Sequence, residues 1–188
     1  MQYLGIEQVT DILRIAYKNS RRDHLLLLLS FSHGLRRSEV ARLRVQDVSG
    51  GLIRVQRCKG SLRTEQPLMA SQNLLFDEPK ALSAWLQERR SKTDYLFPSR
   101  FDDGHLKIKS ASQAAAKVMI DAGIPTELAH HHSLKHALAS LMIRSKVDLS
   151  FVKQALGHAS ISSTIHYVHI ADSEATEKAS QAIQAALS

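Results

Sequence analysis

Hydrophobic positions recur at helical spacing through most of the chain. Residues 6–17, IEQVTDILRIAY, place their apolar side chains three or four positions apart, which predicts an amphipathic helix. The positions on its apolar face are Ile6, Val9, Ile12, Leu13 and Ala16. Residues 22–33, RDHLLLLLSFSH, are apolar nearly all round and predict a helix buried on every side. Gly34 ends that helix, and RRSEVARLRV begins the next, with Ser38 as its N-cap.

The pattern changes at residues 50–69, GGLIRVQRCKGSLRTEQPLM. A Gly-Gly turn leads into alternation through Ile53 and Val55, and KGS makes a second turn, which predicts a β-hairpin with Lys59 near its tip. Helical spacing then returns in the second half of 71–90 and at about 110–123, 133–145, 148–156, 160–170 and 172–187. The predicted fold class is therefore mainly α with a small antiparallel β-sheet (α+β).

Composition narrows the classes of protein and partner. The 188 residues are enough for one well-packed domain. Lys and Arg total 25 against 18 Asp and Glu, a formal charge of 25 − 18 = +7, which favours a polyanionic partner such as nucleic acid. A basic protein without such a partner would have the same balance. One cysteine, Cys58, excludes a disulfide framework within the chain and fits a reducing cytoplasm. The longest apolar run, at 25–31, is too short to span a membrane.

A cluster of histidines begins the apolar segment HHHSLKHALASLMI, residues 130–143. His132 and His136 are four residues apart and share one helix face, which is half of a zinc-binding pattern. The zinc helix of metalloproteases has Glu after its first His, and this chain has Ser133 there. We therefore expect no metal. The remaining interpretations are a phosphate site and an ordinary basic helix start.

Four segments in order resemble the catalytic domain of the tyrosine recombinases, also called the phage-integrase family. They are GLRRSEVARL, RCKGSLRTEQPL, HSLKHALASLMI and LGHASISSTIHYVHI, and they cover nearly the whole chain. The spacing is also similar to that of the family, with 26 residues from His132 to His158 and nine from His158 to Tyr167. The resemblance implies one catalytic set: Arg36, Lys59, His132, Lys135, His158 and the nucleophile Tyr167.

The supporting residues of that set are Glu39, which is able to orient an arginine, and His136, which we expect in the core. Arg37 and Arg63 are candidate DNA contacts, and His130 and His131 are expected in a loop without a role. One position departs from the family pattern, because Lys135 stands where the family has its second arginine. A lysine keeps the charge but lacks the planar fork that holds two phosphate oxygens.

The implied reaction is attack of a tyrosine hydroxyl on a DNA phosphodiester, giving a 3′-phosphotyrosyl bond without metal, ATP or other cofactor. In it Arg36 and His158 donate to phosphate oxygens, Lys59 is the general acid, and His132 assists proton transfer with the tyrosine. Double-stranded DNA is the expected partner, with tetramers on DNA and a monomer without it. We expect residues 1–171 to form the catalytic domain. We also expect the N-terminal DNA-clamp domain of the family to be absent from the chain, as in an excised domain or a minimal member resembling fimbrial-phase invertases.

Several alternatives stay open. Residues 172–187 carry a weak apolar stripe that suits a helix docked on a neighbouring protomer or one folded back on its own domain. Arg36 could be a surface arginine paired with Glu39, and Tyr167 could be a half-buried packing residue. A weakened, recombinase-derived DNA-binding regulator and a type IB topoisomerase are the alternatives for the function as a whole.

Overall fold

The computed structural model describes residues 3–57, 63–101 and 103–158, together with Ser160, Ser162, Thr164, Ile165, Tyr167 and Gln184. The elements run in the order α1 (Ile6–Asn19), α2 (Arg21–Ser32), α3 (Arg37–Ala41), a 3₁₀ turn η1 (Val45–Asp47), β1 (Val48–Ser49), β2 (Leu52–Val55), β3 (Thr64–Pro67), α4 (Glu78–Glu88), α5 (Ile108–Asp121), α6 (His132–Arg144) and α7 (Leu149–Leu156). The predicted class, mainly α with a small antiparallel sheet, is confirmed.

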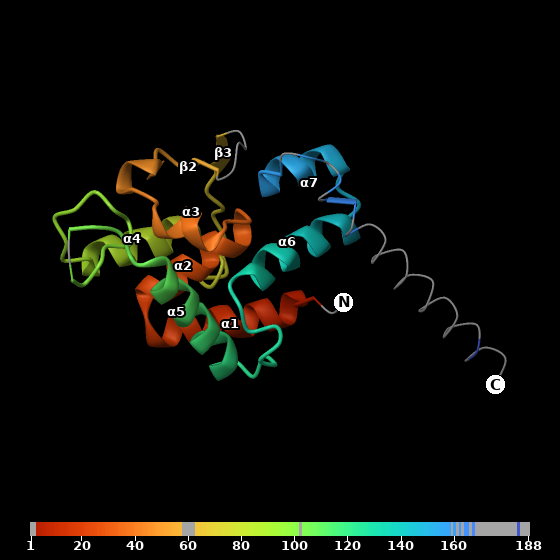
Figure 1. The fold of residues 1–188 in the computed structure, drawn as a ribbon, viewed down its shortest axis with the longest axis horizontal. Coiled ribbons are helices and arrows are strands. Elements are labelled where there is room, and N and C mark those ends of the chain that lie inside the picture. The colour runs from red at the N-terminus through yellow and green to blue at the C-terminus, as the bar shows by residue number, and fades with distance from the viewer. Residues whose placement is uncertain are drawn as a thin grey trace.

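The helix α2 lies at the centre of the molecule. It contacts α1, α3, α4, α5 and α6, and residues 24–31 are all buried, as their unbroken apolar pattern predicts. In Figure 1, α4 lies to the left of α2, and α6 and α7 lie to its right. Four of the five predicted positions of α1 face this core, but Ile6 is 47% exposed because it occupies the first turn, at the edge of the buried stripe.

Gly34 forms the turn that leaves α2. Its φ is +56°, a left-handed conformation that favours glycine. A Cβ atom there would lie 2.9 Å from a side-chain carbon of Leu156 and 3.4 Å from one of Leu138. Glycine is thus required both by the backbone and by the close approach of α6 and α7. The same close approach brings the Gly34 turn, α6 and the end of α7 together, although they are far apart in the sequence.

The sheet has the strand order β1-β2-β3, with both pairs antiparallel. Ile53 of β2 pairs with Val48 on one side and Gln66 on the other. The predicted hairpin is confirmed. The third strand, β1, was not predicted, because two residues are too few to show alternation. Residues 58–62, which include Cys58 and Lys59, lie outside the described residues. The prediction that Lys59 lies near the hairpin tip therefore stays a prediction.

The later helices agree with their predicted ranges within three residues. Gly123 ends the segment after α5 with a φ of +78°, and Asp77 caps α4 through the backbone N–H of Lys80. In the predicted helix 160–170, the described residues Ser162, Thr164, Ile165 and Tyr167 are helical. The predicted helix 172–187 lies outside the described residues except for Gln184. Among the described helices, none is long and apolar enough to cross a membrane.

Candidate phosphate-binding site

The first predicted arginine is held by a buried carboxylate. Arg36 is the N-cap of α3, so the prediction that Ser38 caps this helix is wrong. Glu39 replaces that cap: one carboxylate oxygen accepts the backbone N–H of Arg36 at 2.8 Å, and the other accepts its guanidinium at 2.8 Å. The Glu39 side chain is fully buried, whereas that of Arg36 is 29% exposed. Glu39 therefore fixes the position of Arg36. The pair is not the exposed surface ion pair that was considered as an alternative.

A second arginine, Arg57, shares the same carboxylate. One of its terminal nitrogens lies 3.2 Å from Glu39, and its side chain is fully buried. Sequence reasoning missed this residue, because an arginine after a strand is usually solvated. The signal that could have found it is the buried acid itself, since a carboxylate that is buried needs cationic partners.

His132 is the first residue of α6 and is exposed, close to the cationic side chains of Lys135 and Arg36. Its pKa is lowered from its ordinary value by partial burial and by the charges of Lys135, His130 and Arg36. Its ring meets the edge of the His136 ring at 4.3 Å between centroids. The metal interpretation of this pair gains no support from the described part of the chain, where no three His, Cys, Asp or Glu side chains gather as metal ligands.

Lys135 points into the protein interior. It is 1% exposed, and its amine donates to the backbone carbonyls of Gly34, at 2.9 Å, and of Leu156. Burial, followed by the charges of Arg36 and Arg57, lowers its pKa to about 7. Its place in the family pattern predicts a phosphate contact, and here the amine instead links the Gly34 turn to the end of α7. Its predicted catalytic role stays a prediction.

His158 follows Gly157, which ends α7 in a left-handed conformation. Its Nδ1 atom lies 3.1 Å from the hydroxyl of Thr164, which is fully buried. Burial and the charges of Lys135 and Arg36 lower the pKa of His158 to about 4, so the ring is neutral at pH 7. If Thr164 donates to Nδ1, the Nε2 atom carries the ring proton and can donate to a phosphate oxygen.

Tyr167 lies in an aromatic cluster with Tyr3 and His136. Its hydroxyl is 2.7 Å from Nδ1 of His136, and the Tyr3 ring lies 5.5 Å from His136 and 5.8 Å from Tyr167. Tyr167 is 5% exposed, and burial together with Tyr3 raises its pKa to about 12. His136 was predicted in the core, but it is only partly buried, and its ring also meets that of the exposed His132.

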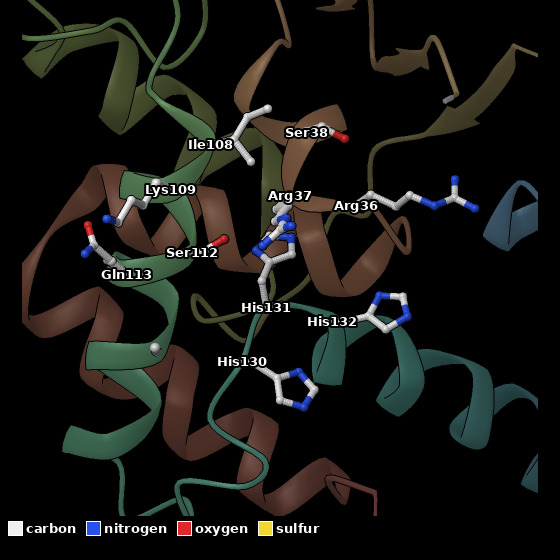
Figure 2. A pocket seen from close by; sticks show the side chains of 11 residues that line it. Arg36, Arg37, Ser38, Ile108, Lys109, Ser112, Gln113, His130, His131 and His132 are labelled. Carbon is white, nitrogen blue, oxygen red and sulfur yellow. The ribbon is translucent and has the colours of Figure 1, made fainter. Parts of the chain in front are cut away.

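An open pocket of about 910 Å³ lies between α3, α5 and the start of α6. Of the predicted catalytic residues, Arg36 and His132 line it, whereas Lys135, His158 and Tyr167 are not in its lining. Figure 2 shows Arg36 and His132 extending to one side of it, while Lys109 and Gln113 come from α5 on the other. The basic residues that line the pocket are Arg36, Arg37, Lys109, His130, His131 and His132. Lys109 was not foreseen, because an isolated lysine in a helix carries no motif. Arg63, the other candidate DNA contact, is exposed and is not part of this lining.

His130 and His131, expected in a loop without a role, both line the pocket. His131 is buried, its Nε2 lies 3.2 Å from the carbonyl of Leu35, and burial lowers its pKa to about 4. Its Nδ1 atom and the hydroxyl of Ser112, also in the lining, are buried without a hydrogen-bond partner among the described residues. Buried polar groups of this kind are usually satisfied by a water or a bound group.

Comparison with known proteins identifies the family. The chain matches the phage integrase family over residues 2–174. It is 33% identical over 153 residues to the type 1 fimbriae regulatory protein FimE of Escherichia coli K12, which covers 78% of this chain and 73% of that protein. The crystal structure of XerA recombinase superposes with a TM-score of 0.78 at 26% identity, covering 96% of this chain. XerH recombinase, solved as a post-cleavage complex on palindromic difH, superposes with a TM-score of 0.77 at 24% identity and 95% coverage.

The chain spans 65% of the length of the XerA chain and 52% of the XerH chain. The match nevertheless extends through all the described elements, from α1 to Tyr167, and so includes both the arginine that Glu39 holds and the tyrosine that contacts His136. The chain belongs to the phage integrase family, the tyrosine recombinases, and corresponds to their catalytic domain.

Proposed function

We propose that this protein is a site-specific DNA recombinase that cuts and rejoins DNA through a covalent bond to Tyr167. One observation carries the proposal. In a member of this family, the buried carboxylate of Glu39 fixes Arg36 beside a basic pocket, and the charge of Arg36 acts on both His132 and His158. A preorganised cationic site of this kind stabilises the charge that develops on phosphate oxygens in a transition state.

In the proposed step, the Tyr167 oxygen attacks phosphorus. A P–O bond to tyrosine forms, the P–O5′ bond breaks, and the 5′ oxygen leaves with a proton that the resemblance assigns to Lys59. Rejoining reverses these events with a 5′-hydroxyl from another strand, so the step needs no ATP. Arg36 and His158 donate to the non-bridging oxygens, and each donor of this kind is typically worth about 10²–10³ in rate.

The proton of Tyr167 needs an acceptor, because a pKa near 12 keeps the phenol neutral at pH 7. Nδ1 of His136 lies at hydrogen-bond distance and can accept it. The resemblance gives this role to His132, whose ring contacts that of His136. We propose that the two histidines act as a pair, with His136 in contact with the phenol and His132 exposed to the substrate side.

Double-stranded DNA is the proposed substrate. The formal charge of +7 and the basic pocket suit a polyanion. XerH was solved on a palindromic substrate, and a palindrome presents equivalent half-sites to two copies of one protein. Strand exchange between two such sites would bring four copies together, so we propose that the protein assembles on DNA as a tetramer and is a monomer without it. Light scattering with and without DNA would test this.

A second candidate is a DNA-binding regulator with weakened chemistry. The observations that favour it are the buried Lys135 amine, bound to two carbonyls, and the buried Tyr167 hydroxyl. In this candidate the pocket binds DNA, but the nucleophile and the second cation do not reach the phosphate.

Trapping on a nicked suicide DNA substrate tests the proposal. We expect wild type to form a covalent protein–DNA adduct that is lost in Tyr167→Phe, while both proteins bind the DNA equally. An adduct from Lys135→Arg but not from wild type would support the regulator. DNA binding without an adduct in both wild type and Lys135→Arg would contradict the catalytic proposal. Relaxation of supercoiled plasmid without strand exchange would indicate a topoisomerase-like activity.

A further inference from the structure

Arg57 joins two segments of the chain that carry predicted catalytic residues. One terminal nitrogen of its guanidinium donates to the carbonyl of Gly34 at 3.3 Å. The other donates to the carbonyls of His33 at 3.0 Å and Ala155 at 2.9 Å. His33 and Gly34 form the turn that leads to Arg36. Ala155 lies in α7, 98 residues from Arg57 in the sequence. The guanidinium therefore holds that turn to the end of α7.

The other contacts of Arg57 extend the same link. Its Nε atom donates to the hydroxyl of Thr64 on β3 at 3.0 Å, across the hairpin on which Lys59 lies in the sequence. Its Nη1 atom lies 3.2 Å from the carboxylate of Glu39, which also holds Arg36. Each N–H of a buried guanidinium must find an acceptor, and this fork reaches acceptors in the turn, α3, β3 and α7.

The turn before His158 packs directly on the Arg57 side chain. A Cβ atom on Gly157 would lie 2.6 Å from Nε, 2.7 Å from Cδ and 2.9 Å from Cγ of Arg57. Gly157 also has a φ of +59°, so both its backbone and its surroundings require glycine. The position of His158 thus depends on a contact between a glycine and this arginine.

We propose that Arg57 is a positioning residue for strand cleavage, which holds Arg36, His158 and the hairpin in one arrangement around the phosphate. This inference rests on the proposed function. Arg57 does not touch the substrate, since its side chain is fully buried. It acts through the groups that do: the turn and carboxylate that fix Arg36, and the glycine turn that fixes His158.

The charge of Arg57 has a measurable effect on neighbouring pKa values, which an uncharged packing residue would not have. Together with larger contributions from burial, it lowers the pKa of both Lys135 and His158. A neutral replacement therefore raises the pKa of Lys135 above about 7, and a lysine replacement keeps it low. The fork geometry is lost in both replacements.

The experiment compares Arg57→Lys and Arg57→Met with wild type and with Arg54→Met. Arg54 is the matched control, because it lies on β2, just before Arg57 in the chain, and makes an ion pair with the exposed Glu65. Adduct formation at saturating suicide DNA is measured beside the Kd for the same DNA. The titration of Lys135 is followed without DNA by NMR of 13C-labelled lysine, and the signal is assigned through Lys135→Arg.

We expect Arg57→Lys to form adduct about 10²-fold more slowly than wild type, because misplacement of catalytic groups by about 1 Å has effects of this size. Its Kd should stay within threefold of wild type, and Arg54→Met should match wild type in both measurements. Arg57→Met should raise the pKa of Lys135. If Arg57→Met does not fold, Arg57→Lys alone decides the rate prediction.

If Arg57→Lys formed adduct at the wild-type rate, the inference would be overturned. The same holds if Arg57→Lys lost DNA affinity by the same factor as its rate of adduct formation. Absence of adduct from wild type is a different result, which contradicts the proposed function itself. In that case the Lys135 titration still tests the link to Arg57, since it requires no DNA. An unchanged Lys135 pKa in Arg57→Met would then contradict it.

Discussion

Arg36 and Tyr167 would meet at one phosphate in the proposed reaction, yet the structure supports them in different ways. Arg36 is fixed by Glu39, which is held in turn by Arg57, and each of these contacts involves the charged Glu39 carboxylate. Tyr167 is fixed by a hydrogen bond to His136 and by the ring of Tyr3. The arginine side of the site is thus a network of buried charges, and the tyrosine side is a small aromatic cluster.

The difference has consequences for how each side can move. Removing one partner of a buried ion pair destabilises the folded protein by several kcal/mol, so the arginine side has one favoured arrangement. Aromatic contacts are worth about 0.5–1.5 kcal/mol each beyond the area they bury, so the tyrosine side can rearrange at small cost. In the proposed reaction, the site would therefore combine a rigid phosphate receptor with a nucleophile that can leave its buried position when DNA binds.

Removal of the Glu39 charge is expected to have the largest effect. Glu39→Gln leaves the buried Arg57 without its anionic partner, which should lower the free energy of unfolding by about 3–5 kcal/mol. It also frees Arg36, so adduct formation should fall about 10²-fold. Urea unfolding and suicide-substrate trapping measure the two effects.

Glu65→Gln is the control for that change. Glu65 pairs with Arg54 at 2.8 Å at the surface, so its loss should change the free energy of unfolding by about 0.5 kcal/mol or less. Equal losses of stability in the two variants would show that the Glu39 network is no stronger than a surface ion pair. The contrast between the two sides of the site would then disappear.

The second prediction concerns pH and Lys135. Its pKa falls from an ordinary 10.5 to about 7 in the folded protein, so between these values the unfolded chain binds the extra proton. The contribution of Lys135 to stability is therefore complete above pH 10.5 and is lost as the pH falls to about 7. Within this window the slope for one proton approaches about 1.4 kcal/mol per pH unit.

Urea unfolding at several pH values tests this prediction when wild type is compared with Lys135→Met. The free energy of unfolding of wild type should rise more steeply between pH 7 and 10 than that of the variant. Lys117→Met serves as the control, because Lys117 is exposed and pairs with Asp121 on the same helix. Parallel pH curves for wild type and Lys135→Met would mean that the Lys135 amine is solvated.

Sequence predicted the helices better than it predicted the contacts of the candidate site residues. The resemblance of the four segments to the family put forward Arg36, Glu39, His132, His158 and Tyr167 as candidate site residues, and their roles stay predictions. Periodic apolar residues, such as the leucines of α2, placed the helices because burial of a helix face depends on local spacing.

The contacts that were missed depend on segments far apart in the chain. Arg57 becomes a fully satisfied buried cation only when α7 brings Ala155 and Gly157 to it. The amine of Lys135 turns inward because the carbonyls of Gly34 and Leu156 meet there. Spacing along the sequence says which residues can share a face, but it does not say which carbonyls lie opposite them.

The smallest expected effect is on the tyrosine side, in Tyr3→Ala. Tyr3 covers the ring of His136 and raises the pKa of Tyr167, so its removal should lower that pKa from about 12 towards 10. The free energy of unfolding should fall by only about 1 kcal/mol for the lost ring contacts. Adduct formation should rise roughly two- to tenfold, because less energy is needed to expose the nucleophile and to remove its proton.

Tyrosinate absorbance, compared with that of the same variant carrying Tyr167→Phe, reports the pKa, and trapping on suicide DNA reports the rate. Tyr17→Ala is the control, because Tyr17 packs edge-on against His24, outside the aromatic cluster of Tyr167, and should change neither value. Slower adduct formation in Tyr3→Ala would reverse the interpretation of the aromatic cluster. Tyr3 would then hold Tyr167 in place for attack, and the tyrosine side would be as preorganised as the arginine side.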